Sequence, residues 1–148
     1  MISKAEILSI SQQTSLGQHV VEKDYVLGWI LAGIYQHDAL APNWLFKGGT
    51  CLKKCFFETY RFSEDLDFTV LKAEHLNAAV LRTIFAEVGE WVYEQTGITI
   101  PVDKQEFETY TNPRGQISCQ GKISYKGPVS PTHLRKYLTK AMHVNAEG

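Results

Sequence analysis

Two aspartates, Asp65 and Asp67, lie one residue apart in the segment YRFSEDLDF, residues 60–68. The segment predicts a strand over about residues 65–70, and residues two apart in a strand project to the same face. Two carboxylates on one face would repel each other unless they shared a cation. Magnesium prefers oxygen ligands, usually one or two carboxylates together with substrate phosphates. The spacing therefore indicates a magnesium site of the kind that assists in-line displacement at phosphorus.

A second feature precedes the aspartates. The segment FKGGT (46–50) places Gly48 and Gly49 between a predicted strand and a predicted helix. Glycines there let backbone N–H groups approach a phosphate, and the N-terminus of the following helix favours negative charge. Lys53 and Lys54 lie near the first turn of that helix, where one of them could reach a phosphate. This part of the chain thus combines an anion-binding loop with a cation site, as a metal–nucleotide complex requires.

Each feature also has an ordinary structural explanation. A Gly-Gly pair is common in turns, and an Asp-x-Asp pair arises often by chance at the entry to a strand. Their occurrence together, in this order and between these elements, favours the functional interpretation.

The elements that must position these residues follow from hydrophobic periodicity and turn signals. Ser3 and Glu6 form a capping box before the first helix, and Gly97 is a natural C-terminal cap. Asn112-Pro113-Arg114-Gly115 predicts a hairpin turn. The predicted helices cover about 4–12, 17–36, 50–57, 73–96 and 134–142, and the predicted strands 44–47, 65–70, 98–110 and 116–126. We therefore predict one α/β (α+β) domain over residues 1–148, with helices packed on a small mixed sheet.

Composition is that of an ordinary globular domain. The 148 residues are 44% hydrophobic and 21% charged, and the formal net charge is −1. This charge does not indicate wholesale binding to nucleic acid or to a membrane, and no apolar run is long enough to span one. The three cysteines, Cys51, Cys55 and Cys119, have no CxxC spacing, which favours reduced thiols in a cytoplasmic protein over a zinc site.

The motif F-K-G-G-T-x-L-x-K-C followed by R-F-S-E-D-L-D-F resembles the AbiEii/AbiGii toxin family of nucleotidyltransferase-fold proteins. The segments VEKDYVLGWIL (21–31) and NPRGQISCQGKISYKGPV (112–129) are also similar to that family, so the resemblance covers most of residues 15–130. It implies a nucleotidyltransferase-like mixed sheet flanked by helices. It also implies transfer of a nucleotidyl group from an NTP to an acceptor hydroxyl, in a bacterial toxin–antitoxin or phage-defence system. The implied partners are an NTP, a tRNA or other RNA acceptor, and a cognate antitoxin.

The same resemblance implies roles for individual residues. Asp65 and Asp67 would hold catalytic Mg²⁺. For Glu22, Lys23 and Asp24, a place on the helix surface or in helix packing is at least as good an explanation as a functional one. The residues implied in binding the nucleotide are Gly48, Gly49, Thr50, Lys54, Arg61 and Ser63.

One expected feature is missing from the sequence. Enzymes of this superfamily add a third carboxylate from a later strand, which we expect soon after SYKGPV (124–129). No aspartate follows Asp103, and Glu147 is the only acid beyond the predicted hairpin. Glu106 and Glu108 would substitute only in a different topology. A shortened family member is the simplest account.

Three hypotheses stay open at this point. The first is a magnesium-dependent nucleotidyltransferase, and the second is a degenerate relative that binds nucleotide or a protein without turnover. The third is a structural fragment that self-associates through an exposed sheet edge, because an incomplete sheet leaves unpaired backbone groups.

Overall fold

The computed structural model describes residues 1–47, 66–111, 113–129, 135–136 and 142–146. Helices and strands are mixed, which confirms the predicted α+β class. The helices are α1 (Lys4–Thr14), α2 (Gln18–Gln36) and α4 (Ala78–Thr96), with short 3₁₀ turns η1 (Ala73–Leu76) and η2 (Val102–Lys104). The strands are β1 (Trp44–Lys47), β2 (Leu66–Val70), β3 (Glu106–Thr111), β4 (Ile117–Lys122), β5 (Ser124–Tyr125), β6 (Arg135–Lys136) and β7 (Met142–Ala146). The predicted helix at 50–57 lies outside the described residues.

Local signals determine where the helices begin and end. The capping box is present: the Ser3 hydroxyl accepts from the Glu6 N–H, and the Glu6 carboxylate accepts from the Ser3 N–H. Gly97 ends α4 with φ +80°, a conformation that favours glycine. The single helix predicted over 73–96 was wrong at its start. Asn77 caps a new helix by accepting from the N–H groups of Ala79 and Val80, and so separates η1 from α4.

Five strands form the main sheet, in the order β1-β2-β7-β4-β3. The hairpin predicted around Gly115 is present, because β3 and β4 pair antiparallel, although β3 begins at Glu106 and not at residue 98. Strand β7 pairs parallel with β2 and antiparallel with β4. Within the described chain it is therefore the strand that joins the β1–β2 pair to the β3–β4 hairpin.

The tail helix predicted for residues 134–142 was wrong. Apolar residues recur there at helical spacing, yet the structure has β6 at Arg135–Lys136 and β7 at Met142–Ala146. Met142, Val144 and Ala146 alternate with polar residues, which also suits a strand. Between β2 and β4, this strand satisfies the backbone groups of two neighbours, and such tertiary pairing outweighs local propensity.

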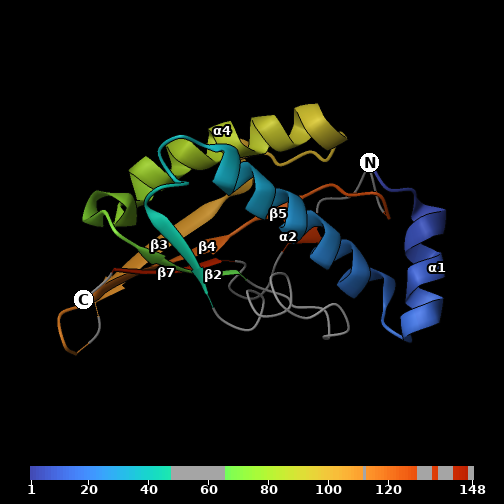
Figure 1. Cartoon of the computed structure of the whole chain (residues 1–148), viewed down its shortest axis with the longest axis horizontal. Coiled ribbons are helices and arrows are strands. Elements are labelled where there is room, and N and C mark those ends of the chain that lie inside the picture. Colours follow the sequence, from blue (N-terminus) through green and yellow to red (C-terminus); the bar gives the residue numbers. More distant parts are fainter. Residues whose placement is uncertain (48–65, 112, 130–134, 137–141, 147–148) are drawn as a thin grey trace.

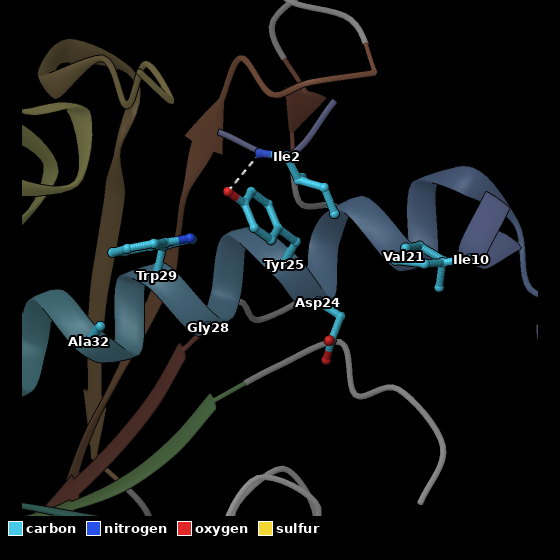
Figure 2. A pocket seen from close by; sticks show the side chains of 8 residues that line it. All are labelled: Ile2, Ile10, Val21, Asp24, Tyr25, Gly28, Trp29 and Ala32. Carbon is cyan, nitrogen blue, oxygen red and sulfur yellow. Dashed lines mark hydrogen bonds between the residues drawn. The ribbon is translucent and has the colours of Figure 1, made fainter. Parts of the chain in front are cut away.

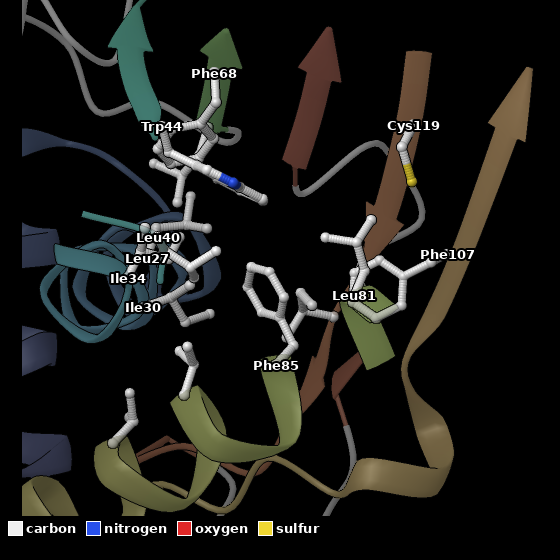
Figure 3. Close-up of a cluster of buried hydrophobic side chains, with 14 of the residues drawn as sticks. Leu27, Ile30, Ile34, Leu40, Trp44, Phe68, Leu81, Phe85, Phe107 and Cys119 are labelled. Atoms are coloured by element: carbon white, nitrogen blue, oxygen red, sulfur yellow. The ribbon is translucent and has the colours of Figure 1, made fainter. Parts of the chain in front are cut away.

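Helices α2 and α4 lie together over one face of the sheet, and α1 packs against α2 (Figure 1). Side chains from both helices and from the sheet form the core between them (Figure 3). Its centre includes the ring of Trp44, whose centroid lies 5.1 Å from that of Phe68 and 5.9 Å from that of Phe85. Gly33 lets α2 approach α4 closely, because a Cβ there would lie 2.9 Å from Cγ1 of Val88.

A buried histidine in this core predicts a pH dependence of stability. The Trp44 indole N–H donates to His75 Nδ1 at 3.0 Å, and burial lowers the pKa of His75 below its ordinary value of 6.5. The unfolded chain therefore takes up a proton that folded His75 resists. The free energy of unfolding should fall as pH is lowered from about 7 to about 5.

Urea denaturation at several pH values measures this effect. His75→Asn is the matched control, since its Oδ1 can still accept from the indole but does not titrate. We expect a flatter pH profile for the variant, and equal slopes for the two proteins would contradict the prediction.

Candidate functional site

Asp67 is the second residue of β2, on the face of the sheet opposite the helices. Leu66, Phe68 and Val70 are buried in the core, whereas Asp67 and Thr69 between them are partly exposed. Alternation along the strand therefore directs the Asp67 carboxylate away from α2 and α4. Of the site residues predicted from the sequence, Asp67 is the one that the structure describes. Asp65, Gly48, Gly49, Thr50, Lys54, Arg61 and Ser63 lie outside the described residues.

Strands β1 and β2 bring the two predicted motifs to one end of an antiparallel pair. Lys47, the last residue of β1, is the register partner of Asp67. Gly48 follows Lys47 in the chain, and Asp65 directly precedes Leu66, the first residue of β2. Chain connectivity thus attaches both motifs to the same end of this pair, as the combination of an anion-binding loop with a cation site requires.

A later strand, β7, lies beside β2, but it carries no acid. β7 runs parallel to β2, and its register partner for Asp67 is His143. The five residues of β7, MHVNA, include no carboxylate. The described strands after SYKGPV, β6 and β7, therefore supply no third carboxylate.

Glu108 does not take over this role. Its register partner is Gln120 on β4, and Gln120 in turn pairs with His143 of β7. Three strand spacings of about 4.8 Å thus separate Glu108 from Asp67, roughly 14 Å between their Cα positions. Glu106 pairs with Lys122, two residues further along the hairpin. Neither glutamate is close enough to share a cation with Asp67, so the substitution considered from the sequence is excluded.

The sequence did not predict that His143 is the register partner of Asp67, or that Gln120 is the register partner of His143. The signal for Gln120 was the alternation in residues 117–125, which indicates a strand but not its register. The signal for His143 was hidden because the pattern of the tail predicts a helix. Register across strands distant in sequence is a property of the assembled sheet.

The carboxylate of Asp67 suits a hard cation that takes most of its other ligands from water and from the substrate. Within the described residues, no group of three His, Cys, Asp or Glu side chains could hold a metal ion. Asp67, with Asp65 beyond the edge of the described strand, would supply one or two carboxylates. Magnesium is usually held in that way, with water and substrate phosphates completing its shell.

Cys119 does not contribute to chemistry on this face. It belongs to the core side of β4, and burial raises the pKa of its thiol to about 11. The thiol is therefore protonated at neutral pH and is a poor nucleophile and metal ligand. Cys51 and Cys55 lie outside the described residues.

The described part of the chain also has a hollow of about 390 Å³, between the N-terminal segment and α2 (Figure 2). Tyr25 and Trp29 rise into it from α2, and the Ile2 N–H donates to the Tyr25 hydroxyl at 3.0 Å. Asp24 of the same helix also lines the hollow (Figure 2). Asp67, the one predicted site residue that the structure describes, does not line this hollow. No helix among the described residues is both long and apolar enough to cross a bilayer.

Comparison with known proteins gave one family. The sequence profile described as "Nucleotidyl transferase AbiEii toxin, Type IV TA system" matches residues 29–130, more than half of the chain. The matched range includes both central motifs, all of β1 to β5 and part of α2. Comparison with curated proteins gave no match.

Proposed function

The chain belongs to the nucleotidyl transferase AbiEii toxin family, and from that premise we propose that it binds an NTP with Mg²⁺ and transfers the nucleotidyl group to an acceptor hydroxyl. The observation that carries the proposal is the position of Asp67. Its carboxylate lies on the sheet face opposite α2 and α4, at the strand pair to which the Gly48-Gly49 motif is attached.

Each group in the proposed site has a distinct task. Asp67 and Asp65 would hold the cation, which when bound supplies positive charge to the α-phosphate. The backbone N–H groups of Gly48 and Gly49 would hold the triphosphate, as glycine-rich loops before helices do. Thr50, Lys54, Arg61 and Ser63 would add polar and cationic contacts to the phosphates.

The acceptor and the biological setting are inferred from the family alone. We propose an RNA acceptor such as tRNA, a cognate antitoxin that restrains the protein, and action in the cytoplasm, where NTPs and RNA are available. A second candidate function is nucleotide binding without turnover. The specific observation in its favour is the absence of a carboxylate from β7. Strands β1 and β3 are the outer strands of the described sheet, so self-association through an edge is a further hypothesis.

Isothermal titration of each NTP in the presence of Mg²⁺ tests the proposed site. We expect binding to wild-type protein that requires Mg²⁺. The double variant Asp65→Ala/Asp67→Ala should bind at least about 100-fold more weakly, which corresponds to roughly 3 kcal/mol. Glu108→Ala is the matched control, since it removes a carboxylate too far away to share the cation and should leave affinity unchanged.

Incubation with labelled NTP and tRNA then separates the two candidate functions. Labelled RNA would support transfer, and Mg²⁺-dependent binding without product would support the non-catalytic relative. A folded wild-type protein that binds no nucleotide would contradict both.

A further inference from the structure

Glu22 is a carboxylate that the structure places in the interior. It lies on α2 with an exposed fraction of 0%. Burying a carboxylate is costly unless hydrogen bonds or an opposite charge compensate for the lost water. A buried carboxylate such as that of Glu22 therefore needs hydrogen-bond partners that offset the lost hydration.

The partners of Glu22 come from a segment far along the chain. The Tyr125 hydroxyl donates to Oε1 at 3.0 Å, and the Val129 N–H donates to Oε2 at 2.6 Å. Both oxygens thus accept a hydrogen bond from one short stretch, 125–129. Hydrogen bonds to charged acceptors are shorter and stronger than neutral ones, so this double contact ties the stretch firmly to α2.

The stretch is shaped around the carboxylate. A Cβ at Gly127 would lie 2.9 Å from Oε2 of Glu22, closer than a real Cβ approaches such an atom. The glycine therefore leaves room for the carboxylate between the two residues that donate to it. Lys126, in the middle of the stretch, also pairs with Thr99 through two backbone hydrogen bonds of 2.9 and 3.3 Å.

The chain beyond this stretch completes the main sheet. Strand β5, which ends at Tyr125, pairs with β6, so the chain turns back on itself directly after the Glu22 contacts. It then supplies β7, the strand that lies between β2 and β4. The residues that Glu22 contacts, 125–129, therefore immediately precede the part of the chain that supplies β6 and β7.

We propose that Glu22 is a positioning residue for the nucleotide site. Its carboxylate is a buried latch that holds residues 125–129 against α2, so that β7 docks between β2 and β4 and keeps the Asp67 strand in place. The effect on nucleotide rests on the proposed function, whereas the effect on the sheet does not. Glu22 touches neither the proposed cation nor the phosphates.

Hydrogen–deuterium exchange and nucleotide titration on four variants test the latch. Glu22→Ala removes both hydrogen bonds, and Tyr125→Phe removes one. Glu22→Gln can keep both, because its Oε1 can accept from the Val129 N–H while its Nε2 donates to the Tyr125 oxygen. Val92→Ala is the control for stability alone, since Val92 is buried between α2 and α4, away from the latch.

In Glu22→Ala we expect the rate of amide exchange, relative to wild type, to increase more in β2 and β7 than in α4. We also expect about tenfold weaker binding of Mg²⁺ with whichever of ATP, CTP, GTP and UTP the wild type binds, a loss typical of a lost supporting contact. Tyr125→Phe should show a smaller change of the same pattern, and Glu22→Gln should restore the wild-type behaviour. Val92→Ala should speed exchange without singling out β2 and β7.

Two results would overturn the proposal. One is exchange that rises evenly through the chain in Glu22→Ala and Tyr125→Phe, as in Val92→Ala, which would make Glu22 a contributor to general stability only. The other is a Glu22→Gln variant as impaired as Glu22→Ala, which would assign the effect to charge and not to the hydrogen bonds. If wild-type protein binds no nucleotide, the proposed function is wrong. The pattern of amide exchange still tests whether Glu22 holds β7 in place.

Discussion

Replacing Phe68 by alanine is expected to lower the free energy of unfolding by about 3–5 kcal/mol, the range measured for large aromatic residues in cores. Phe68 is completely buried, and its ring centroid lies 5.1 Å from that of Trp44 and 5.5 Å from that of Phe46. The truncation would leave a cavity beside these two rings of β1, which cannot close without moving β1 or β2. A change of this size is a large fraction of the stability of a domain of ordinary size.

Urea denaturation followed by tryptophan fluorescence measures the loss. Leu45→Ala is the matched control, because Leu45 lies on β1 next to Phe46 but is 51% exposed. It should cost less than about 1 kcal/mol, since little buried apolar area is removed. Similar losses for the two variants would contradict the arrangement in which the Phe68 side of the sheet faces the helices.

Replacing His143 by aspartate is expected to raise nucleotidyl transfer by at least about tenfold, because it adds negative charge where a cation would be held. Position 143 is the register partner of Asp67 on the neighbouring parallel strand. The substitution would therefore add a carboxylate at the position paired with Asp67, on the later strand that lies beside β2.

Asn145→Asp is the matched control for this gain of activity. It adds the same charge to the same strand, but its register partner is Thr69, about 7 Å further along β2. Transfer of label from NTP to RNA is the measurement. Equal rates for the two variants would show that added charge alone accounts for the change. No gain from His143→Asp would show that the missing acid is not the factor that limits transfer.

Several features of this protein follow from the sequence alone. The capping box at Ser3, the cap at Gly97 and the turn at Gly115 depend on residues within a few positions of one another, so local chemistry determines them. The alternation of Leu66, Phe68 and Val70 with Asp67 and Thr69 likewise decides which side of β2 carries the carboxylate. The motifs around Gly48-Gly49 and Asp65-Leu66-Asp67 were enough to indicate the family, because each motif is recognised from consecutive residues, whatever elements pack around it.

Other features were decided by tertiary structure. The tail has apolar residues at helical spacing, yet β7 is a strand because β2 and β4 both present backbone groups that it satisfies. The helical pattern of residues 17–36 was correct, but it did not reveal that Glu22 is buried, since its two donors lie far along the chain, at Tyr125 and Val129. Strand order also places Glu108 three strands from Asp67. Pairings between distant segments are chosen by the free energy of the whole assembled sheet, and local periodicity does not encode that choice.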